Sequence, residues 1–401
     1  MAVRGRVSVS IGVVGGGIAG IAAAIALARK GFEVAVFEQA AAAETAGAGV
    51  QIGPNAARAL QAIGAYDAVV AVSTAPRALA VHNGETGALL TEIPFGTRFE
   101  TRYGAAYRVG HRADLLNALL RTAAAHDGIS LRYDSRVTAL TAEAAGRQRL
   151  VLADGSAHAV EAVIGADGIR STVRAKLLHD GSPAASGHRL YRALLRCAAA
   201  PREIIADQVS LYLLKNAHAV AYAVAGGSLI NLVVVVAGHG DGDGWSAPAE
   251  QAEVIAALPR RARVLDELLH AAPGWARFMG ADRPPAARWG DGTVTLVGDA
   301  AHPALPFLAQ GAAMALEDAA VLGRLAGGAP LAETFRAYER HRLARTARLT
   351  LAARRQGSLY HHGGPVGRLR DLVLRLLPGP LAIRRLDWLY GWHPPADVNA
   401  I

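Results

Sequence analysis

The sequence predicts an α/β fold in which a βαβ frame is interleaved with a mostly antiparallel β-sheet and followed by a helical C-terminal region. Three observations support this prediction. A β-branched run near the N-terminus ends in three glycines and leads into an alanine-rich helix. Residues from about 188 to 240 are β-rich and lack helical periodicity, whereas residues 312–357 have the periodicity of amphipathic helices.

The N-terminal βαβ unit follows from the order of its segments. The run at 11–14 predicts a strand, the segment 18–30 predicts a helix that Gly31 ends, and 34–37 predicts the next strand. A second α/β stretch covers residues 110–178. Its predicted elements are a helix at 113–125 and strands near 130–133, 150–152 and 162–165.

The middle of the chain differs from both α/β stretches. The β-rich runs 209–214, 219–225 and 229–236 predict an antiparallel sheet. The chain then turns helical at 248–269 and returns to a short buried strand at 294–297. The antiparallel sheet is therefore predicted to interrupt the βαβ frame.

Composition indicates a globular protein with one large or two interleaved domains. The chain has 401 residues, of which 52% are hydrophobic and 19% charged. The net charge of +9 comes from scattered arginines without long basic runs, which argues against nucleic-acid binding. The longest apolar stretch, 229–237, is too short to span a bilayer. Cys197 is the only cysteine, so we expect no disulfide and a cytoplasmic location.

A glycine-rich loop joins the first predicted strand to its helix. Gly15, Gly17 and Gly20 form the pattern G-x-G-x-x-G, which lets the backbone approach a pyrophosphate at the positive end of a helix. Glu38 lies 23 residues after Gly15 (38 − 15 = 23), where a carboxylate would bind a ribose diol. The pattern favours dinucleotide binding, with a tight structural turn as the alternative interpretation. It does not distinguish FAD from NAD.

Two acidic residues follow two other predicted strands. Asp167 in GADGIRSTVR stands at a strand end, where open α/β sheets bind ligands, although an Asp-Gly turn is an alternative interpretation. Asp299 in VGDAAHPALPFLAQGAA is a second such acid, and Gln310-Gly311-Ala312 begins a helix after it. Free amides at that helix start would suit an electron-rich ring edge or a developing anion.

Four stretches in this order resemble the fingerprint of the single-component FAD-dependent aromatic hydroxylases. They are GGGIAGIAAAIALARKGFEVAVFE, GAGVQIGPNAARAL, GHRADLLNALL with VIGADGIRSTVR, and VTLVGDAAHPALPFLAQGAAMALEDAA. The similarity spans roughly residues 10–355, and it is greatest to the salicylate hydroxylase, 3-hydroxybenzoate 6-hydroxylase and 6-hydroxynicotinate 3-monooxygenase group, whose members the ending RLDWLYGW also resembles.

The resemblance implies a p-hydroxybenzoate hydroxylase-like architecture with three parts. A discontinuous Rossmann-like FAD-binding domain would comprise residues 1–75, 109–180 and 286–335. Residues 76–108 and 181–285 would form the substrate domain, and 336–401 the helical C-terminal region. The resemblance also implies a monomer or homodimer that acts in aromatic catabolism. It would use NADH or NADPH and O₂ to hydroxylate a small hydroxybenzoate or N-heteroaromatic acid through a C4a-hydroperoxyflavin.

The family's FAD contacts can be carried over residue by residue. Gly15, Gly17, Gly20 and Glu38 would hold the adenosine half, Asp167 the pyrophosphate region and Asp299 the ribityl chain. The remaining contacts would come from Arg112 on the FAD backbone, from Gly311 and Ala312 on the flavin ring, and from Gly49, Val50 and Gln51 beside the ring. Pro306 and Gln310 would face the substrate, with Pro306 helping to exclude water from the flavin.

Ring hydroxylation requires an electron-rich ring, so a base must deprotonate the substrate's phenol. His218 and Tyr222 lie four residues apart, which places both on one face of a strand. In the group that the chain resembles, a His and Tyr pair in a comparable strand is associated with the substrate hydroxyl. We therefore expect His218 to be the base and Tyr222 an orienter or relay, although either is alternatively a strand residue without a role. Arg192 and Arg196 are candidates for binding the substrate carboxylate, or else surface arginines.

Several other patterns are interpreted as structural. His302 is read as part of a turn, His361 and His362 as a surface pair, and Asp241 and Asp243 as residues of a solvated loop, so no metal site is predicted. Gln310 is alternatively a helix cap. The stretch YERHRLARTARLTLAARRQ is interpreted as a solvated helix face or a dimer contact.

Two rival functions remain open. The first is an FAD-dependent epoxidase, reductase or hydroxylase of a larger natural product. The second is an NAD-linked dehydrogenase or a nucleotide-sensing module that uses only the N-terminal loop.

Overall fold

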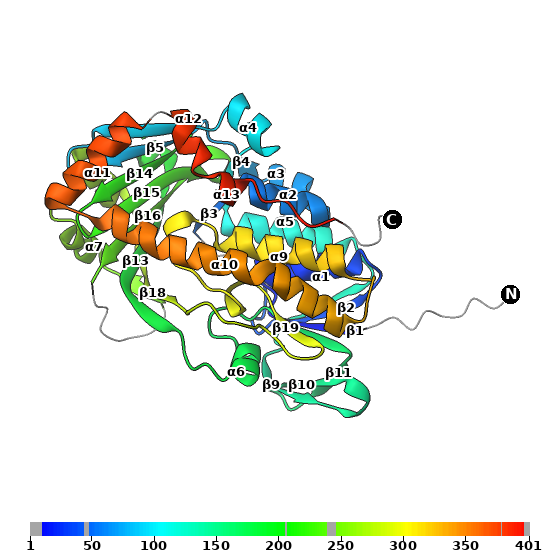
Figure 1. Ribbon diagram of the computed structural model, residues 1–401. Coiled ribbons are helices and arrows are strands. Elements are labelled where there is room, and N and C mark those ends of the chain that lie inside the picture. Colours follow the sequence, from blue (N-terminus) through cyan, green and yellow to red (C-terminus); the bar gives the residue numbers. More distant parts are fainter. Residues whose placement is uncertain (1–9, 44–47, 205–206, 239–245, 378, 397–401) are drawn as a thin grey trace.

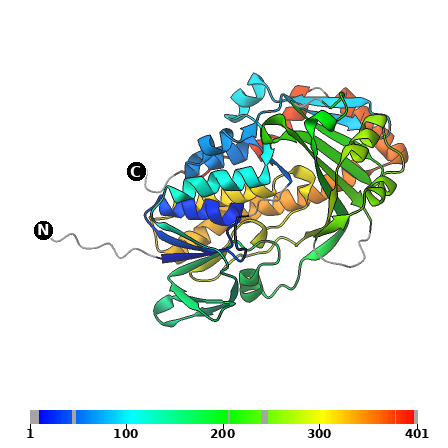
Figure 2. The same ribbon diagram turned by 180° about the vertical axis from the view of Figure 1, so that it is seen from behind.

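The computed structural model describes residues 10–43, 48–204, 207–238, 246–377 and 379–396. It has two main sheets joined by a layer of helices (Figure 1). Seen from behind, the first strands of the chain lie toward one end and the larger sheet toward the other (Figure 2). The predicted α/β fold with an interrupting antiparallel sheet and a helical C-terminal region is confirmed.

The smaller main sheet has five parallel strands in the order β19-β12-β1-β2-β8. Their bounds are Val294–Leu296, Ala162–Gly165, Ser10–Val14, Glu33–Phe37 and Ile129–Arg132. The strands β1, β12 and β19 end within three residues of Gly15, Asp167 and Asp299 respectively. Because the carboxyl ends of neighbouring parallel strands share one edge, three loops singled out in the sequence meet there.

Helices cover one face of the parallel sheet and a small sheet covers the other. The helices are α1 (Ile18–Ala28), α2 (Pro54–Ile63), α3 (Tyr66–Val70), α5 (Arg112–Ala124) and α9 (Gly311–Leu325). The small sheet contains β9 (Val137–Ala142), β10 (Gln148–Leu152) and β11 (Ala157–Val160). Buried alanines in α1 and α9 let these two helices pack closely, and Leu150 and Val160 pack on the opposite face of β1.

The larger sheet has eight strands in the order β17-β18-β13-β16-β15-β14-β5-β6. Their bounds are Ser246–Ala249, Trp275–Asp282, Ala184–Arg196, Leu229–Ala237, Ala217–Val224, Gln208–Leu214, Ala78–Asn83 and Leu89–Pro94. All neighbours are antiparallel except β14 and β5. The helices α7 (Gln251–Ala257) and α8 (Arg263–Ala271) cover one face of this sheet. The single helix predicted at 248–269 is therefore wrong: its first residues belong to strand β17, and the rest form these two helices.

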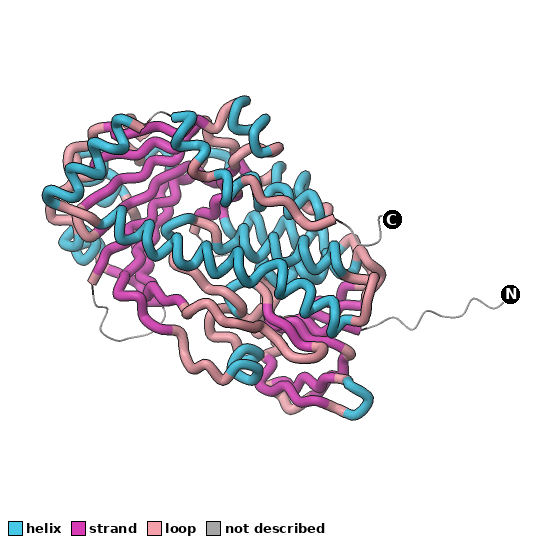
Figure 3. Tube along the Cα trace, viewed as in Figure 1, coloured by secondary structure: helices cyan, strands magenta, loops and turns pink. Residues whose placement is uncertain are grey.

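Helix α10 (Leu331–His361) runs from the parallel sheet to the uncovered face of the larger sheet (Figure 1). It belongs to the helical layer that lies between the two groups of strands in Figure 3. The prediction that its 338–356 stretch is a solvated face or a dimer contact is wrong for the inner side, because Tyr338 and Arg342 are fully buried. The other C-terminal helices are α11 (Gly364–Leu376), α12 (Gly379–Arg384) and α13 (Asp387–Tyr390).

A further small sheet and two short helices complete the fold. The sheet has the order β3-β7-β4, from Gly49–Ile52, Arg108–His111 and Ser73–Thr74, and the helices are α4 (Thr97–Tyr103) and α6 (Thr172–Leu178). In the part of the chain that the structure describes, no helix combines the length and the apolar character that crossing a membrane would require. The division into domains stays a prediction.

Candidate functional site

The glycine loop after β1 has little room for side chains except at one position. Gly15 has a φ of +107°, and a Cβ there would lie 2.5 Å from the carbonyl oxygen of Ala166. A Cβ on Gly20 would lie 1.9 Å from the carbonyl oxygen of Gly15. Gly17, in contrast, precedes α1 without a side-chain cap, and a Cβ there would meet no atom within 4 Å. The open start of α1 therefore fits a pyrophosphate.

The carboxylate of Glu38 lies against this loop. Its Oε2 accepts a hydrogen bond from the amide of Gly16 at 2.7 Å, and its Oε1 accepts one from the amide of Ala40 at 2.8 Å. Each carboxylate oxygen can accept more than one hydrogen bond. Glu38 is therefore held at the end of β2 with capacity left for ribose hydroxyls.

Asp167 caps the helix that follows it. Its Oδ2 accepts hydrogen bonds from the amides of Thr172 and Val173 at 2.7 and 3.2 Å, and its Oδ1 accepts one from the hydroxyl of Ser171. Burial raises the pKa of Asp167, and these hydrogen bonds oppose the increase. The Asp167 backbone also borders the loop, because its Cα would lie 3.1 Å from a Cβ on Gly15. Asp167 thus shapes α6 and one wall of the glycine loop.

Asp299 and Arg112 come together from distant parts of the chain. Asp299 has an accessible side chain in the 3₁₀ turn Gly298–Ala300 after β19. Desolvation by the surrounding protein raises its pKa, and the positive charges of His302 and Arg112 oppose the increase. Arg112 is the first residue of α5, and its amide donates to the carbonyl of Ala48 at 3.0 Å. This edge of the parallel sheet therefore presents one acidic side chain, Asp299, and one cationic side chain, Arg112.

The second open helix start is that of α9. Gln310 occupies the N-cap position without a side-chain cap hydrogen bond, so the interpretation of Gln310 as a capping residue is wrong. A Cβ on Gly311 would meet no atom within 4 Å, and Ala312 is only partly buried. The unpaired amides of a 15-residue helix carry partial positive charge. This position fits the electron-rich edge of a flavin ring.

Strand β3 approaches the larger sheet closely. The amide of Gly49 donates to Oδ1 of Asn231 at 2.6 Å, and a Cβ on Gly49 would lie 2.5 Å from the Tyr222 hydroxyl oxygen. Val50 is partly buried, and Oε1 of Gln51 accepts a hydrogen bond from the Tyr107 hydroxyl at 2.5 Å. Only glycine at position 49 permits this approach without displacing Tyr222 or Asn231.

His218 and Tyr222 lie on the face of β15 that is opposite α7 and α8. The alanines between them belong to the cluster under those two helices, whereas Tyr222 packs near Gly49 and the His218 ring lies 5.4 Å from that of Phe307. Burial lowers the pKa of His218 well below its usual value, with the charges of His361 and His188 acting in the same direction. Burial raises the pKa of Tyr222, opposed by Arg192 and Gln51. His218 is thus kept neutral and Tyr222 protonated.

His361 was missed by the sequence analysis. It is 8% exposed, and its Nε2 lies 3.0 Å from Nδ1 of His218, so the interpretation of His361 as a surface residue is wrong; His362 is exposed. Phe307 was missed too. Pro306 is exposed, while Phe307 packs between His188, His218 and His361. The only sequence feature that could have indicated the packing of Phe307 is that it is the aromatic residue of the LPFLAQG stretch.

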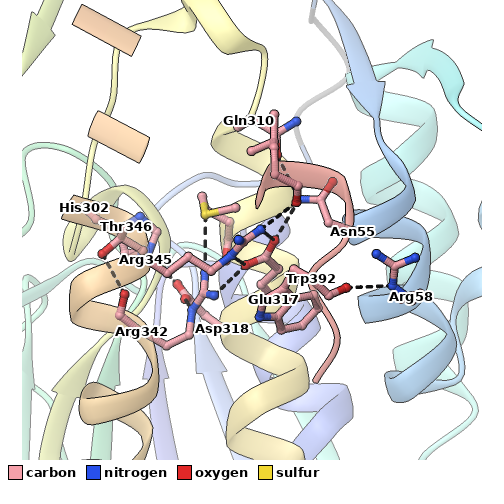
Figure 4. Close-up of polar contacts among 12 residues, drawn as sticks. Asn55, Arg58, His302, Gln310, Glu317, Asp318, Arg342, Arg345, Thr346 and Trp392 are labelled. Atoms are coloured by element: carbon pink, nitrogen blue, oxygen red, sulfur yellow. Dashed lines mark hydrogen bonds and ion pairs between the residues drawn. The ribbon is translucent and has the colours of Figure 1, made fainter. Parts of the chain in front are cut away.

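A buried ionic network lies beneath Gln310 (Figure 4). Glu317 and Asp318 on α9 are 0% exposed and are paired with Arg342 on α10, which is also 0% exposed. Burial raises the pKa of Asp318, but the positive charges of His302 and Arg342 outweigh this effect and lower it. His302 lies 2.6 Å from Asp318, in accord with its structural interpretation. The acidic pair within an apolar helix was the sequence signal for this network.

Two remaining sequence interpretations concern metal ions. Among the described residues, no cluster of three histidine, cysteine or acidic side chains could hold a metal ion. Asp241 and Asp243 lie outside the described residues.

The fold and these two open helix starts are those of a dinucleotide-binding protein. A family model described as the FAD binding domain matches residues 7–353. The 3-hydroxybenzoate 6-hydroxylase of Polaromonas naphthalenivorans (strain CJ2) is 34% identical over 383 residues, covering 95% of each chain. The 6-hydroxynicotinate 3-monooxygenase of Bordetella bronchiseptica is 35% identical over 345 residues, covering 84% of this chain and 89% of that one. A solved salicylate hydroxylase substrate complex is 25% identical, with a TM-score of 0.81 and 96% of each chain covered.

The chain therefore belongs to the FAD-binding domain family. The predicted resemblance to FAD-dependent aromatic hydroxylases, the FAD cofactor and the monooxygenase class are confirmed.

Proposed function

We propose that this enzyme hydroxylates a small aromatic acid bearing a ring hydroxyl, with NAD(P)H as reductant and O₂ as oxidant. The observation that carries the proposal is the position of β15. Its His218 end packs against Phe307, next to Pro306, and its Tyr222 end packs against Gly49. A single strand face thus reaches both segments that flank the flavin in this family.

The position of Arg192 is evidence that the substrate carries a carboxylate. The sheet register pairs Arg192 with Val233, between the row of Tyr222 and Asn231 and the row of His218 and Val235. The guanidinium carbon lies 4.8 Å from the centre of the Phe278 ring, and the Arg192 charge acts on Tyr222. A cation between the two rows suits an aromatic acid whose hydroxyl lies near His218. Arg196 is exposed at the strand end and does not share this arrangement.

Bound FAD supplies the redox chemistry and the activation of oxygen, and the chain supplies binding and proton transfer. Gly15, Gly17, Gly20 and Glu38 would hold the adenosine half, and Gly311 and Ala312 would donate amides to the flavin ring. The remaining proposed FAD contacts are Gly49, Val50, Gln51, Arg112, Asp167, Asp299 and Pro306. Gly17 and Gly311 lie at open helix starts and residues 49–51 at a strand edge, whereas Asp167 would contribute through the wall of the glycine loop.

His218 would take the proton from the substrate hydroxyl, which makes the ring electron-rich. Its neutral state at physiological pH leaves it able to accept that proton. Tyr222 keeps its own proton and would donate a hydrogen bond to the substrate. Gln310, 3% exposed at the start of α9, would contact the same oxygen.

A substrate screen tests the proposal directly. Hydroxybenzoates and hydroxypyridine carboxylates are compared for substrate-dependent consumption of NAD(P)H and O₂ by the FAD-loaded enzyme, with product analysis. We expect hydroxylated product from at least one small acid. No response across the panel, together with intact FAD binding, would favour a larger natural product as substrate. We also infer a cytoplasmic location and a monomer or homodimer.

A further inference from the structure

We propose that Asn55 positions the side-chain amide of Gln310 so that Nε2, and not Oε1, faces the substrate. The proposal rests on the proposed function, in which Gln310 contacts the substrate hydroxyl. Asn55 is therefore a positioning residue, which acts on the substrate only through Gln310.

Asn55 joins two side chains that are distant in sequence. Its Nδ2 donates one hydrogen bond to Oε1 of Gln310 at 2.8 Å and a second to Oε1 of Glu317 at 2.7 Å (Figure 4). Asn55 is the second residue of α2 and is 0% exposed, and Gln310 is 3% exposed. Water is thus largely excluded from these two bonds, so the direction of each bond is set by the protein.

The charges beneath Asn55 decide that direction. Glu317 accepts hydrogen bonds from the guanidinium groups of Arg342 and Arg345, the latter from Nε at 2.6 Å and from Nη2 at 2.7 Å. Between two cations Glu317 is a carboxylate, which can only accept hydrogen bonds. Asn55 must therefore present its Nδ2 to Glu317. The opposite orientation would place the Asn55 oxygen against a buried carboxylate oxygen, which is unfavourable at low dielectric.

The orientation of Asn55 then sets that of Gln310. Because Nδ2 of Asn55 is a donor only, Gln310 must offer its Oε1. None of the hydrogen bonds among the described residues uses Nε2 of Gln310, so its two N–H groups can donate to a ligand. A fixed donor beside the substrate oxygen favours the oxyanion that forms when His218 takes the proton. An amide that could rotate would not discriminate between the neutral hydroxyl and the oxyanion.

The network also reaches the C-terminal segment. Arg345 donates to the carbonyl oxygens of Trp388 and Leu389, both at 2.9 Å. The RLDWLYGW stretch thereby holds Arg345 in place against Glu317. Contacts from α2, α9, α10 and the C-terminal segment all converge on the orientation of one amide.

The test measures the pKa of the bound substrate hydroxyl in FAD-loaded enzyme, by titrating the phenolate absorbance of 3-hydroxybenzoate or of the acid with the best turnover in the screen. The variants are Asn55→Ala, Gln310→Ala and the double variant, with Gln61→Ala as the control because Gln61 is an exposed residue of α2. We expect Asn55→Ala to raise this pKa by about one unit and to lower kcat about tenfold, with a smaller change in KM. Gln61→Ala should change neither.

The double variant distinguishes positioning from a general structural effect. If Asn55 acts through Gln310, Asn55→Ala has no further effect in the Gln310→Ala background. Effects that multiply instead would overturn the proposal, as would a normal pKa of the bound hydroxyl in Asn55→Ala. If Gln310→Ala itself leaves that pKa unchanged, the substrate role of Gln310 fails, and the Asn55 proposal with it. If Asn55→Ala does not retain FAD, the milder Asn55→Ser and Glu317→Gln variants are measured in the same way, with the same expectation and the same contradicting outcome.

Discussion

The Nδ1 atom of His218 lies 3.0 Å from the Nε2 atom of His361, where the end of α10 meets strand β15. Burial lowers the pKa of both side chains, that of His361 to about 4. Both imidazoles are therefore neutral at physiological pH, so that one donates and the other accepts the hydrogen bond between them. This pairing joins the proposed base to the long C-terminal helix.

Replacing the proposed base should abolish most of the chemistry. We expect His218→Ala to lower kcat for ring hydroxylation by roughly 10²- to 10⁴-fold and to remove the dependence of kcat on the ionisation of that group. The measurement is hydroxylated product per unit time as a function of pH. His341→Ala, at an exposed position of α10, is the matched control. An unchanged rate and pH profile for His218→Ala would show that another group is the base.

The same histidine pair should make stability depend on pH. The folded pKa of His361 lies at about 4, below the usual 6.5, so the unfolded chain binds more protons between these values. Its contribution to stability is complete above pH 6.5 and is lost as the pH falls toward 4, by up to about 3 kcal/mol. Urea unfolding at several pH values measures this effect. His361→Gln should have a shallower pH dependence over that range; an identical one would contradict the assignment.

Two glycines of the N-terminal loop should respond differently to alanine. Gly20→Ala forces a Cβ to within 1.9 Å of the Gly15 carbonyl oxygen, so we expect loss of stability and of FAD together. Gly17→Ala places its Cβ in open space, so the apoprotein should keep its melting temperature while FAD binds more weakly. Flavin absorbance per protein and thermal unfolding of the apoprotein separate the two effects. Undiminished FAD affinity in Gly17→Ala would argue against a pyrophosphate at this loop.

Arg192→Met should weaken the binding of a substrate carboxylate. We expect KM for the aromatic acid to increase by about tenfold or more, since a partly buried charge-assisted pair is lost. The amide analogue of the same substrate, which carries no charge, should be affected much less. Arg196→Met is the control because Arg196 is exposed at the end of the same strand. Equal effects of Arg192→Met on the acid and on its amide would exclude Arg192 as the carboxylate anchor.

The buried ionic network should be costly to interrupt. Arg342→Met leaves Glu317 and Asp318 without their shared cation, so the free energy of unfolding should fall by about 3–5 kcal/mol. Arg340→Met, at an exposed position of the same helix, should have little effect. Denaturant unfolding of the two variants gives the comparison. A loss no larger than that of the control would mean that water or a rearranged side chain replaces Arg342.

Local rules were enough to predict the framework of the fold, whereas the individual FAD contacts were implied only by the resemblance to the family. Glycine positions, strand ends and helix starts are set by steric limits within a few residues, so the loop at Gly15 and the start of α9 at Gly311 could be placed from the printed order of residues. The even spacing of His218 and Tyr222 predicted a shared strand face for the same reason. The same local rules missed strand β17 and the division of the helix predicted at 248–269.

The long-range partners could not be predicted in this way. His361 lies 143 residues from His218, and Asn55 lies 255 residues from Gln310. No local periodicity relates such positions, and a run of arginines on a helix predicts solvent exposure unless buried acids are known to face it. The sequence by itself determined which backbone segments could cradle a dinucleotide and that His218 and Tyr222 share one strand face. Only the tertiary structure decided which histidine and which amide contact the proposed catalytic groups, because packing brings together side chains whose separation along the chain carries no geometric information.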